Sequence, residues 1–526
     1  MKKHNTIKVV LITILVLLLL TWILPAAYYS GEFVDQGRVQ MGLFDLFNYP
    51  LTALSYFGYI GLFLILVGGF YGILYKIPAY RAFLDRIVKS ANKHEAVSIS
   101  TMVIVLALLV SICGVQIGIA LFIPLIVSII LLMGYDKIVA ALVTVGSISA
   151  GLIGSTYAYA NVSVLTSTLA LKLDYQIGVR FVILLVGIVL VIFNTLMYMK
   201  TNGKVKVTDK IEKEVKEMEE KVEEVKKEVT KKVNTAKKTA AKKTGTKKTT
   251  AKKSTSSKTR KSVNKAALMD EDVIVVPKKV LGSHNIWPFV VTFTLLFVVF
   301  VLAFITWGDN GFGVKLFDNM TKSFQEFKLF KFPLFAKVFG TINSFGNWSI
   351  TDMFLPMFLT IVLLVIIYKV KLDDVFDGFV EGVKKALAPA FISLLIYTVL
   401  VLVTYHPFQL TIYKAVLGMT KGFNIITTSI VAIIASLLNG DAAYSFQSVI
   451  PYYASVVTKT GNYPLVAVIF QSMYGLTMLV APTSLILMAT LSFLKVSYKD
   501  WLKNSWKLLV ELFVVLLIVF IILALM

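Results

Sequence analysis

The sequence contains a single cysteine, Cys113, which lies in an apolar stretch. One cysteine excludes an intramolecular disulfide framework and a metal site built from several thiolates. The sequence also lacks the HExxH pattern of zinc hydrolases, the GxSxG nucleophile elbow and the GxxxxGK[ST] phosphate loop. We therefore expect no enzyme of these classes and no bound metal or organic cofactor.

Charged residues are also scarce, at 16% of the chain, whereas 57% of the residues are hydrophobic. The apolar residues fall into runs close to the roughly 20 residues that a helix needs to cross a bilayer. Runs this long and continuous exclude a transmembrane barrel, so the sequence predicts an all-α polytopic membrane protein. The apolar segments lie near residues 7–29, 51–75, 96–113, 115–133, 137–171, 177–199, 286–307, 350–369, 382–403, 423–438, 441–457, 462–494 and 506–526.

Acidic residues are absent from positions 231–265, which contain 14 Lys or Arg. This segment cannot bury enough apolar surface to fold, and we expect it to be disordered. It follows a heptad pattern over 209–232 that predicts a short helix or coiled coil. The sequence thus predicts a first membrane repeat at 1–200, a cytoplasmic basic linker at 201–285 and a second membrane repeat at 286–526. Contact of the linker with anionic lipid is one expectation and a solvated tether is the other. Nucleic-acid binding is not expected, because no aromatic residue lies among the lysines.

Lysine and arginine cluster in short loops on one side of the predicted spans, which places the N-terminus and the linker on the cytoplasmic side. The membrane is expected to be the cell membrane, either a plasma or an inner membrane. The segment 313–346 departs from this pattern, since its five lysines would lie outside. It is rich in phenylalanine, and we expect it to lie on the membrane surface with its lysines snorkelling. Lys172, Asp174 and Arg180 lie near the end of a span and are expected to be interfacial anchors.

Several features recur in the same order in the two halves. Pro124 precedes Gly134 by the same distance as Pro451 precedes Gly461, and small polar residues follow in each half. The charge pattern orients the halves oppositely, so we predict two inverted repeats, each with a re-entrant hairpin and a broken transmembrane helix. The other matches are Gly154-Ser155-Thr156 with Pro482-Thr483-Ser484, and Leu74-Tyr75-Lys76 with Ile367-Tyr368-Lys369.

Helices that end inside the membrane leave N–H and C=O groups that bind anions and cations, respectively. The predicted substrate and ion site therefore combines the two hairpin tips with the two breaks. Na⁺ is one expected ligand, near Ser155, Thr156, Thr483 and Ser484; H⁺ is the other candidate for a coupling ion. The site residues are Gly114, Gln116, Gly154, Ser155, Thr156, Asn161, Asn439, Gly440, Asp441, Pro482, Thr483 and Ser484.

Asp441 is the acidic residue at one predicted tip. Acidic groups at membrane depth are costly and usually functional, so Asp441 is a candidate ligand for a cation or a substrate amine. The alternative is that it caps the helix that follows Gly440, and both roles can hold together.

The segments GYDKIVAALVTVGSISAGLIGSTYAYANV (134–162) and YPLVAVIFQSMYGLTMLVAPTSLILMA (463–489) resemble the signature regions of the anaerobic C4-dicarboxylate carrier family within the ion-transporter superfamily. The segments LVGGFYGILYK (66–76) and VSYKDWLK (496–503) are similar to its YfcC-like branch. The resemblance implies a secondary carrier of dicarboxylates or amino acids with a site between two hairpins. Both tips depart from the family's usual pattern, which leaves the substrate open.

We thus expect a secondary active transporter, symporter or antiporter, of small carboxylate-bearing metabolites, either an amino acid or a C4-dicarboxylate, working by alternating access. The alternative is a membrane anchor or scaffold whose polybasic linker recruits acidic partners. The sequence leaves a homodimer open. Paired breaks within the spans favour the carrier, because an anchor needs none.

Overall fold

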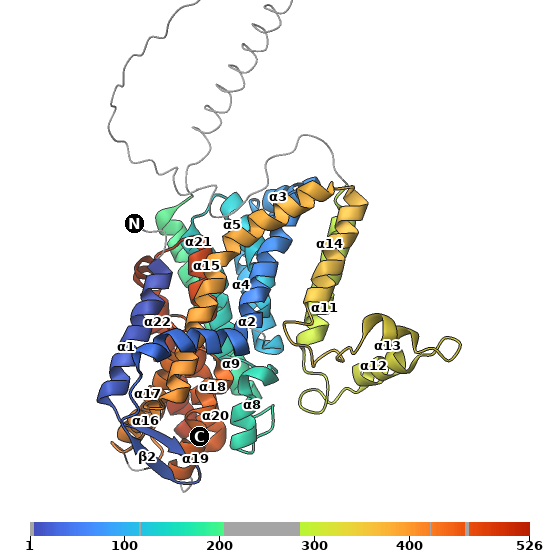
Figure 1. Ribbon diagram of the computed structural model, residues 1–526. Coiled ribbons are helices and arrows are strands. Elements are labelled where there is room, and N and C mark those ends of the chain that lie inside the picture. The colour runs from blue at the N-terminus through green and yellow to red at the C-terminus, as the bar shows by residue number, and fades with distance from the viewer. Residues whose placement is uncertain (1–4, 115–116, 205–284, 421, 458–461, 526) are drawn as a thin grey trace, which may run out of the picture. The chain divides into compact units, whose positions relative to one another are not determined.

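The computed structural model describes residues 5–114, 117–204, 285–420, 422–457 and 462–525 (Figure 1). Apart from Lys204, these residues belong to one compact unit formed by Met1–Gly203 and Glu271–Met526. The helix expected at 209–232 and the polybasic stretch at 231–265 lie outside the described residues.

The described residues confirm an all-α polytopic membrane protein. Seven of their helices are long and apolar enough to cross a membrane, and the described sheet is a single hairpin of β1 (Ala26–Tyr29) and β2 (Phe33–Gly37). Backbone groups satisfied within each helix make this the stable way to span lipid. The seven helices are α1 (Asn5–Ile23), α2 (Leu43–Leu74), α4 (Glu95–Cys113), α9 (Ile177–Asn202), α11 (Trp287–Phe304), α15 (Leu372–Tyr405) and α22 (Tyr498–Leu525).

Shorter helices complete two series of elements with the same order. The first series runs α2, α3 (Pro78–Ala91), α4, η1 (Gly118–Leu121), α5 (Ile123–Leu132), α6 (Lys137–Ala141), η2 (Leu142–Gly146), α7 (Ser147–Ile153), α8 (Tyr159–Thr168) and α9. The second runs α15, α16 (Gln409–Leu417), α17 (Ile425–Leu438), α18 (Ala442–Gln447), α19 (Ile450–Val457), α20 (Tyr463–Thr477), α21 (Leu485–Leu494) and α22. In each series a surface helix, a helix hairpin, an interrupted helix and a long span follow one another.

The two series run in opposite directions. Figure 1 shows α3, α5 and α21 at one end of the unit, and α8, α16 and α19 at the other end. We call these the α3 end and the α16 end. The first hairpin therefore opens at the α3 end and the second at the α16 end, which is the arrangement expected of inverted repeats.

One of the repeat matches made from the sequence is wrong. Tyr75 follows α2, whereas Tyr368 ends α14 (Phe354–Tyr368), which precedes α15 rather than corresponding to α2. A tyrosine followed by a lysine is common wherever a span reaches the membrane surface, because aromatic and basic side chains favour that interface. The tripeptide thus marks helix ends and not equivalent positions.

Corresponding helices α2 and α15 pack against one another through glycines. A Cβ on Gly72 would lie 2.0 Å from the carbonyl oxygen of Gly378, and one on Gly382 would lie 2.0 Å from that of Gly68. Small residues allow two membrane helices to approach this closely, which gives van der Waals contact along their length. The pair also contacts η1 of the first half and α17 and α21 of the second half.

Replacing Gly72 by Ala is expected to destabilise this packing by about 1–3 kcal/mol, the usual cost of overpacking a close interface. The measurement is the thermal unfolding midpoint of the purified protein in detergent. Gly178→Ala in α9 is the matched control, because a Cβ at Gly178 meets no atom within 4 Å. A lower midpoint for both variants, or for neither, would contradict the close α2–α15 contact.

Candidate functional site

Each half contains a helix hairpin whose two arms meet near its open end. In the first half, the Tyr135 hydroxyl, just after α5, donates a hydrogen bond to the Glu95 carboxylate at the start of α4. In the second half, the Tyr453 hydroxyl of α19 lies 2.8 Å from the Thr428 hydroxyl near the start of α17. Each hairpin thus enters and leaves at the same end of the unit.

The tip of each hairpin lies against the interrupted helix of its own half. Gly114 follows α4 in the left-handed conformation (φ +70°), and a Cβ there would lie 2.8 Å from the Cβ of Ala158. A Cβ on Gly440 would lie 1.9 Å from the carbonyl oxygen of Thr483. Only glycine fits both positions, since φ and space each exclude a side chain at Gly114 and space excludes one at Gly440.

The first interruption separates α7 from α8, and Arg180 of α9 donates hydrogen bonds to its carbonyls. The Arg180 side chain is fully buried, and its Nε donates to the Ser155 carbonyl at 2.7 Å. Its guanidinium also donates to the carbonyls of Thr156, Leu173 (2.6 Å) and Tyr175 (3.1 Å). The prediction that Arg180 is an interfacial anchor is therefore wrong. The loop before α9 folds back over the side chain and supplies two of its four acceptors, the carbonyls of Leu173 and Tyr175.

Residues from α4 and α20 also donate hydrogen bonds to carbonyls of the first interruption. The Ser111 hydroxyl donates to the Gly154 carbonyl at 2.9 Å, and the Ser472 hydroxyl donates to that of Ile153 at 3.0 Å. Gln471 Nε2 donates to the Ser155 carbonyl at 2.9 Å. Because these acceptors are already used, a Na⁺ ion at this break would depend on their remaining lone pairs. The buried Ser155 hydroxyl has no hydrogen-bond partner and stays available.

The second interruption, between α20 and α21, is similarly satisfied. The Thr483 hydroxyl donates to the carbonyl of Leu437 at 2.9 Å, and the Ser484 hydroxyl caps α21. The Trp501 indole, from α22, donates to the Leu479 carbonyl at 2.9 Å. Side chains thus stabilise both breaks, as an uncapped helix end away from water requires.

One cavity of about 340 Å³ lies where the two tips, α8 and α21 meet the α2–α15 pair. Five of the predicted site residues line it: Gly114, Asn161, Gly440, Asp441 and Thr483. The other predicted residues, Gly154, Ser155, Thr156, Asn439, Pro482 and Ser484, lie at the same tips and breaks but not among its lining residues. Gln116 lies outside the described residues.

Donors and acceptors are separated within this cavity. Asn161 is 6% exposed, and its Nδ2 donor has no hydrogen-bond partner. Ala160, beside it, is the second residue of α8, whose N-terminus lacks a side-chain cap. Together they favour an anionic group, because the amide presents an unpaired N–H donor and a helix N-terminus carries a partial positive charge.

Asp441 supplies negative charge on another wall. One of its carboxylate oxygens accepts from the backbone N–H groups of Ala443 (3.0 Å) and Tyr444 (3.3 Å), which confirms the predicted cap of α18. No Arg, Lys or His is found among the described residues that line the cavity. A ligand with both a carboxylate and a cationic group would therefore match this lining better than a dianion alone.

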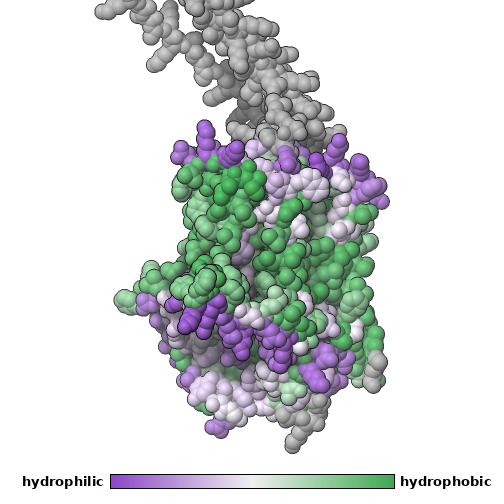
Figure 2. Space-filling view, turned by 90° about the vertical axis from the view of Figure 1, so that its right-hand side faces the viewer, coloured by the Kyte–Doolittle hydropathy of each residue, from purple (hydrophilic) through white to green (hydrophobic). Residues whose placement is uncertain are grey.

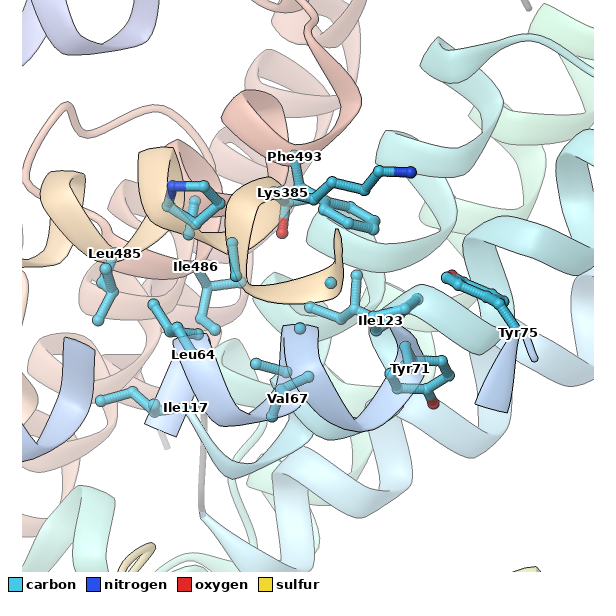
Figure 3. Close-up of a pocket in the computed structure, with 18 residues that line it drawn as sticks. Leu64, Val67, Tyr71, Tyr75, Ile117, Ile123, Lys385, Leu485, Ile486 and Phe493 are labelled. Carbon is cyan, nitrogen blue, oxygen red and sulfur yellow. The ribbon is translucent and has the colours of Figure 1, made fainter. Parts of the chain in front are cut away.

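A second pocket of about 70 Å³ continues from the cavity towards the α3 end (Figure 3). Ile117, Leu485 and Ile486 line both spaces and lie at one end of this pocket, with Tyr75 at the other end. Its lining is largely apolar. The three shared side chains lie between the cavity and the rest of this pocket.

Several lining residues are not among those predicted from the sequence. Tyr59 of α2 and Tyr397 of α15 face the cavity, as does Tyr474 of α20. A phenol inside an otherwise apolar span is the signal that points to them, since a buried hydroxyl needs a polar neighbour. Tyr474 has one, because its hydroxyl donates to the Gly440 carbonyl at 2.8 Å.

Comparison with family models gives one match, described as C4-dicarboxylate anaerobic carrier, over residues 4–525. No curated protein and no solved structure matches the chain. The family match covers nearly the whole sequence, including both hairpins and both interruptions.

Proposed function

The chain belongs to the C4-dicarboxylate anaerobic carrier family, and from this premise we propose that it is a secondary active transporter working by alternating access. A multi-pass carrier, rather than an enzyme, is what the family and the apolar helices indicate. The substrate class is a small carboxylate-bearing metabolite. The YfcC-like branch, the coupling ion and the substrate within this class are parts of the proposal.

The observation that carries the proposal is the cavity shared by both halves. A carrier that works by alternating access needs a central site with two routes that open in turn. The cavity supplies the site, and the apolar side chains of Ile117, Leu485 and Ile486, which line both pockets, would close the route to the α3 end. Movement of either hairpin against the α2–α15 pair would change access on one side only, because the hairpins open at opposite ends.

The orientation follows from positive charge. Lys76, Arg81, Arg86, Lys89 and Lys93 lie in or beside α3. Because basic residues favour the cytoplasmic side, we place the α3 end in the cytoplasm and the protein in the cell membrane.

The chemistry of the cavity supports one of the two substrate classes more than the other. The family description points to C4-dicarboxylates. The lining, however, offers donors at Asn161 and a carboxylate at Asp441, with no lysine, arginine or histidine among its described residues. We propose that the substrate carboxylate binds at Asn161 and the α8 N-terminus. Asp441 binds an amine of the substrate or a coupling cation, Na⁺ or H⁺.

Uptake by the purified protein in proteoliposomes tests the function. A panel of labelled amino acids and C4-dicarboxylates is offered with imposed Na⁺ or proton gradients, and with internal substrate to detect exchange. We expect saturable uptake of at least one compound, driven by a gradient or by exchange. Uptake no greater than in empty vesicles throughout the panel would reject the carrier and leave the scaffold with its basic linker.

Replacing Asn161 by Asp is expected to abolish this uptake, because a second carboxylate would repel the substrate anion and remove its amide donor. Loss of a charge-assisted hydrogen bond alone corresponds to roughly 1.5–3 kcal/mol, or a tenfold or greater loss of affinity. Asn202→Asp, at an exposed position of α9 where the amide donates to the Tyr198 carbonyl, is a control outside the lining. Unchanged uptake and apparent affinity in Asn161→Asp would show that the carboxylate binds elsewhere.

A further inference from the structure

The segment 313–346, which we call the paddle, has no core of its own. It contains α12 (Leu316–Glu326) and α13 (Leu334–Phe339), and none of its 34 residues is buried. Its two helices are joined by aromatic contacts, with the rings of Phe324 and Phe335 stacked at 4.2 Å. A segment so rich in apolar side chains, all at least partly exposed, is not a stable arrangement in water alone.

The outward-facing side chains of the paddle are large and apolar. Phe330 is 96% exposed, at the turn between the two helices. Further exposed apolar residues lie on both sides of this turn: Leu316, Met320, Phe327, Leu329, Phe332, Val338 and Phe339. Figure 2, which faces this part of the unit, shows apolar surface over the paddle with a band of hydrophilic surface beside it.

The paddle is fixed at the ends of two membrane helices. The Gly346 N–H donates to the carbonyl of Ala303, in the last turn of α11, at 2.9 Å. The Trp307 ring, just after α11, packs on Phe317 at 5.1 Å. Because the chain returns to the apolar helix α14 soon after Gly346, the paddle lies beside the end of α11 and the start of α14. The exposed apolar faces of α11 and α14 continue into it.

Its charge matches the same location. All five lysines of the paddle are exposed, and Asp318 and Glu326 are its two acidic residues. Lysine stems extend along apolar surface while their ammonium groups reach the phosphates of lipid headgroups. A second protein surface would favour apolar side chains grouped apart from lysines, since lysine is depleted in protein interfaces.

We propose that the paddle is a membrane-binding surface that inserts its apolar side chains, with Phe330 at the turn, into the headgroup and acyl boundary of the leaflet at the α16 end. The occupant is the lipid of the same bilayer that α11 crosses. The interaction does not depend on which substrate the central cavity takes.

Site-directed spin labelling of the full chain in lipid vesicles tests the proposal. Phe330→Cys is labelled with a nitroxide, and collision rates are measured with oxygen, which concentrates in lipid, and with a water-soluble nickel chelate. Cys113 is buried, so unsubstituted protein serves as the background control. Gln36→Cys, on the exposed strand β2 at the same end, is the matched control for an aqueous position.

We expect the label at position 330 to collide with oxygen several-fold more than with the nickel chelate, and the label at 36 to show the reverse. Nickel accessibility at 330 equal to that at 36 would overturn the proposal. Protection from both reagents, or dipolar broadening between labels, would also overturn it, because a protein surface would then cover the paddle. Phe332→Cys repeats the measurement if the first variant is poorly produced.

Discussion

Asp441→Asn is expected to abolish coupled uptake while the protein remains folded. Asparagine caps a helix about as well as aspartate does, so the bonds to the N–H groups of Ala443 and Tyr444 persist. What the variant loses is the negative charge in the cavity. Removing one partner of a desolvated charge pair costs about 2–5 kcal/mol, or roughly 30-fold or more in affinity. The measurement is substrate uptake as a function of substrate concentration and of the imposed gradient.

Asp136→Asn is the matched control for this variant. Asp136 caps α6 in the same way, accepting from the N–H groups of Ile138 (3.1 Å) and Val139 (3.0 Å), but it does not line the cavity. Its substitution should leave the substrate affinity and ion dependence unchanged. If Asp441→Asn also kept the affinity and the ion dependence of the unsubstituted protein, Asp441 would be a helix cap and nothing more.

Arg180→Lys is expected to lower stability and to stop transport even though it keeps the positive charge. The guanidinium donates to four carbonyls at the first interruption and in the loop before α9, and an ammonium cannot reach them all. Each buried carbonyl left without a donor costs about 1–3 kcal/mol. Thermal unfolding in detergent and uptake in proteoliposomes are both measured. Arg38→Lys, at an exposed position after β2, is the control.

The contrary result for Arg180→Lys would be an unchanged unfolding midpoint with normal uptake. The interruption would then be held by the hydrogen bonds from Ser111, Gln471 and Ser472 alone. A stable variant without uptake would still support the account, since the position of α8 and Asn161 depends on the shape of this break.

The sequence predicts the fold class and the positions of the tips and breaks because few residue types suit them. Gly114 and Gly440 mark the tips, since no side chain fits there. Small hydroxyl residues mark the breaks, and the Thr483 hydroxyl does donate to the Leu437 carbonyl in the first arm of the second hairpin. Residue composition and local chemistry are therefore enough to predict the fold class, the tips and the breaks.

The sequence could not predict which residues face one another across the two halves. Arg180 lies near the start of a span, where interfacial basic residues are common, and only the folded loop before α9 shows that it is buried. Tyr59 and Tyr397 lie in spans so apolar that periodicity does not identify the inner face. Long-range packing decides both cases.

The most direct test of the account is an electron cryo-microscopy map of the protein with the compound that it transports best. We predict density for the compound in the cavity of about 340 Å³, with its carboxylate near Asn161 and the remainder towards Asp441. An ordered compound elsewhere in the protein, with this cavity holding only solvent at saturating concentration, would contradict the assignment of the site.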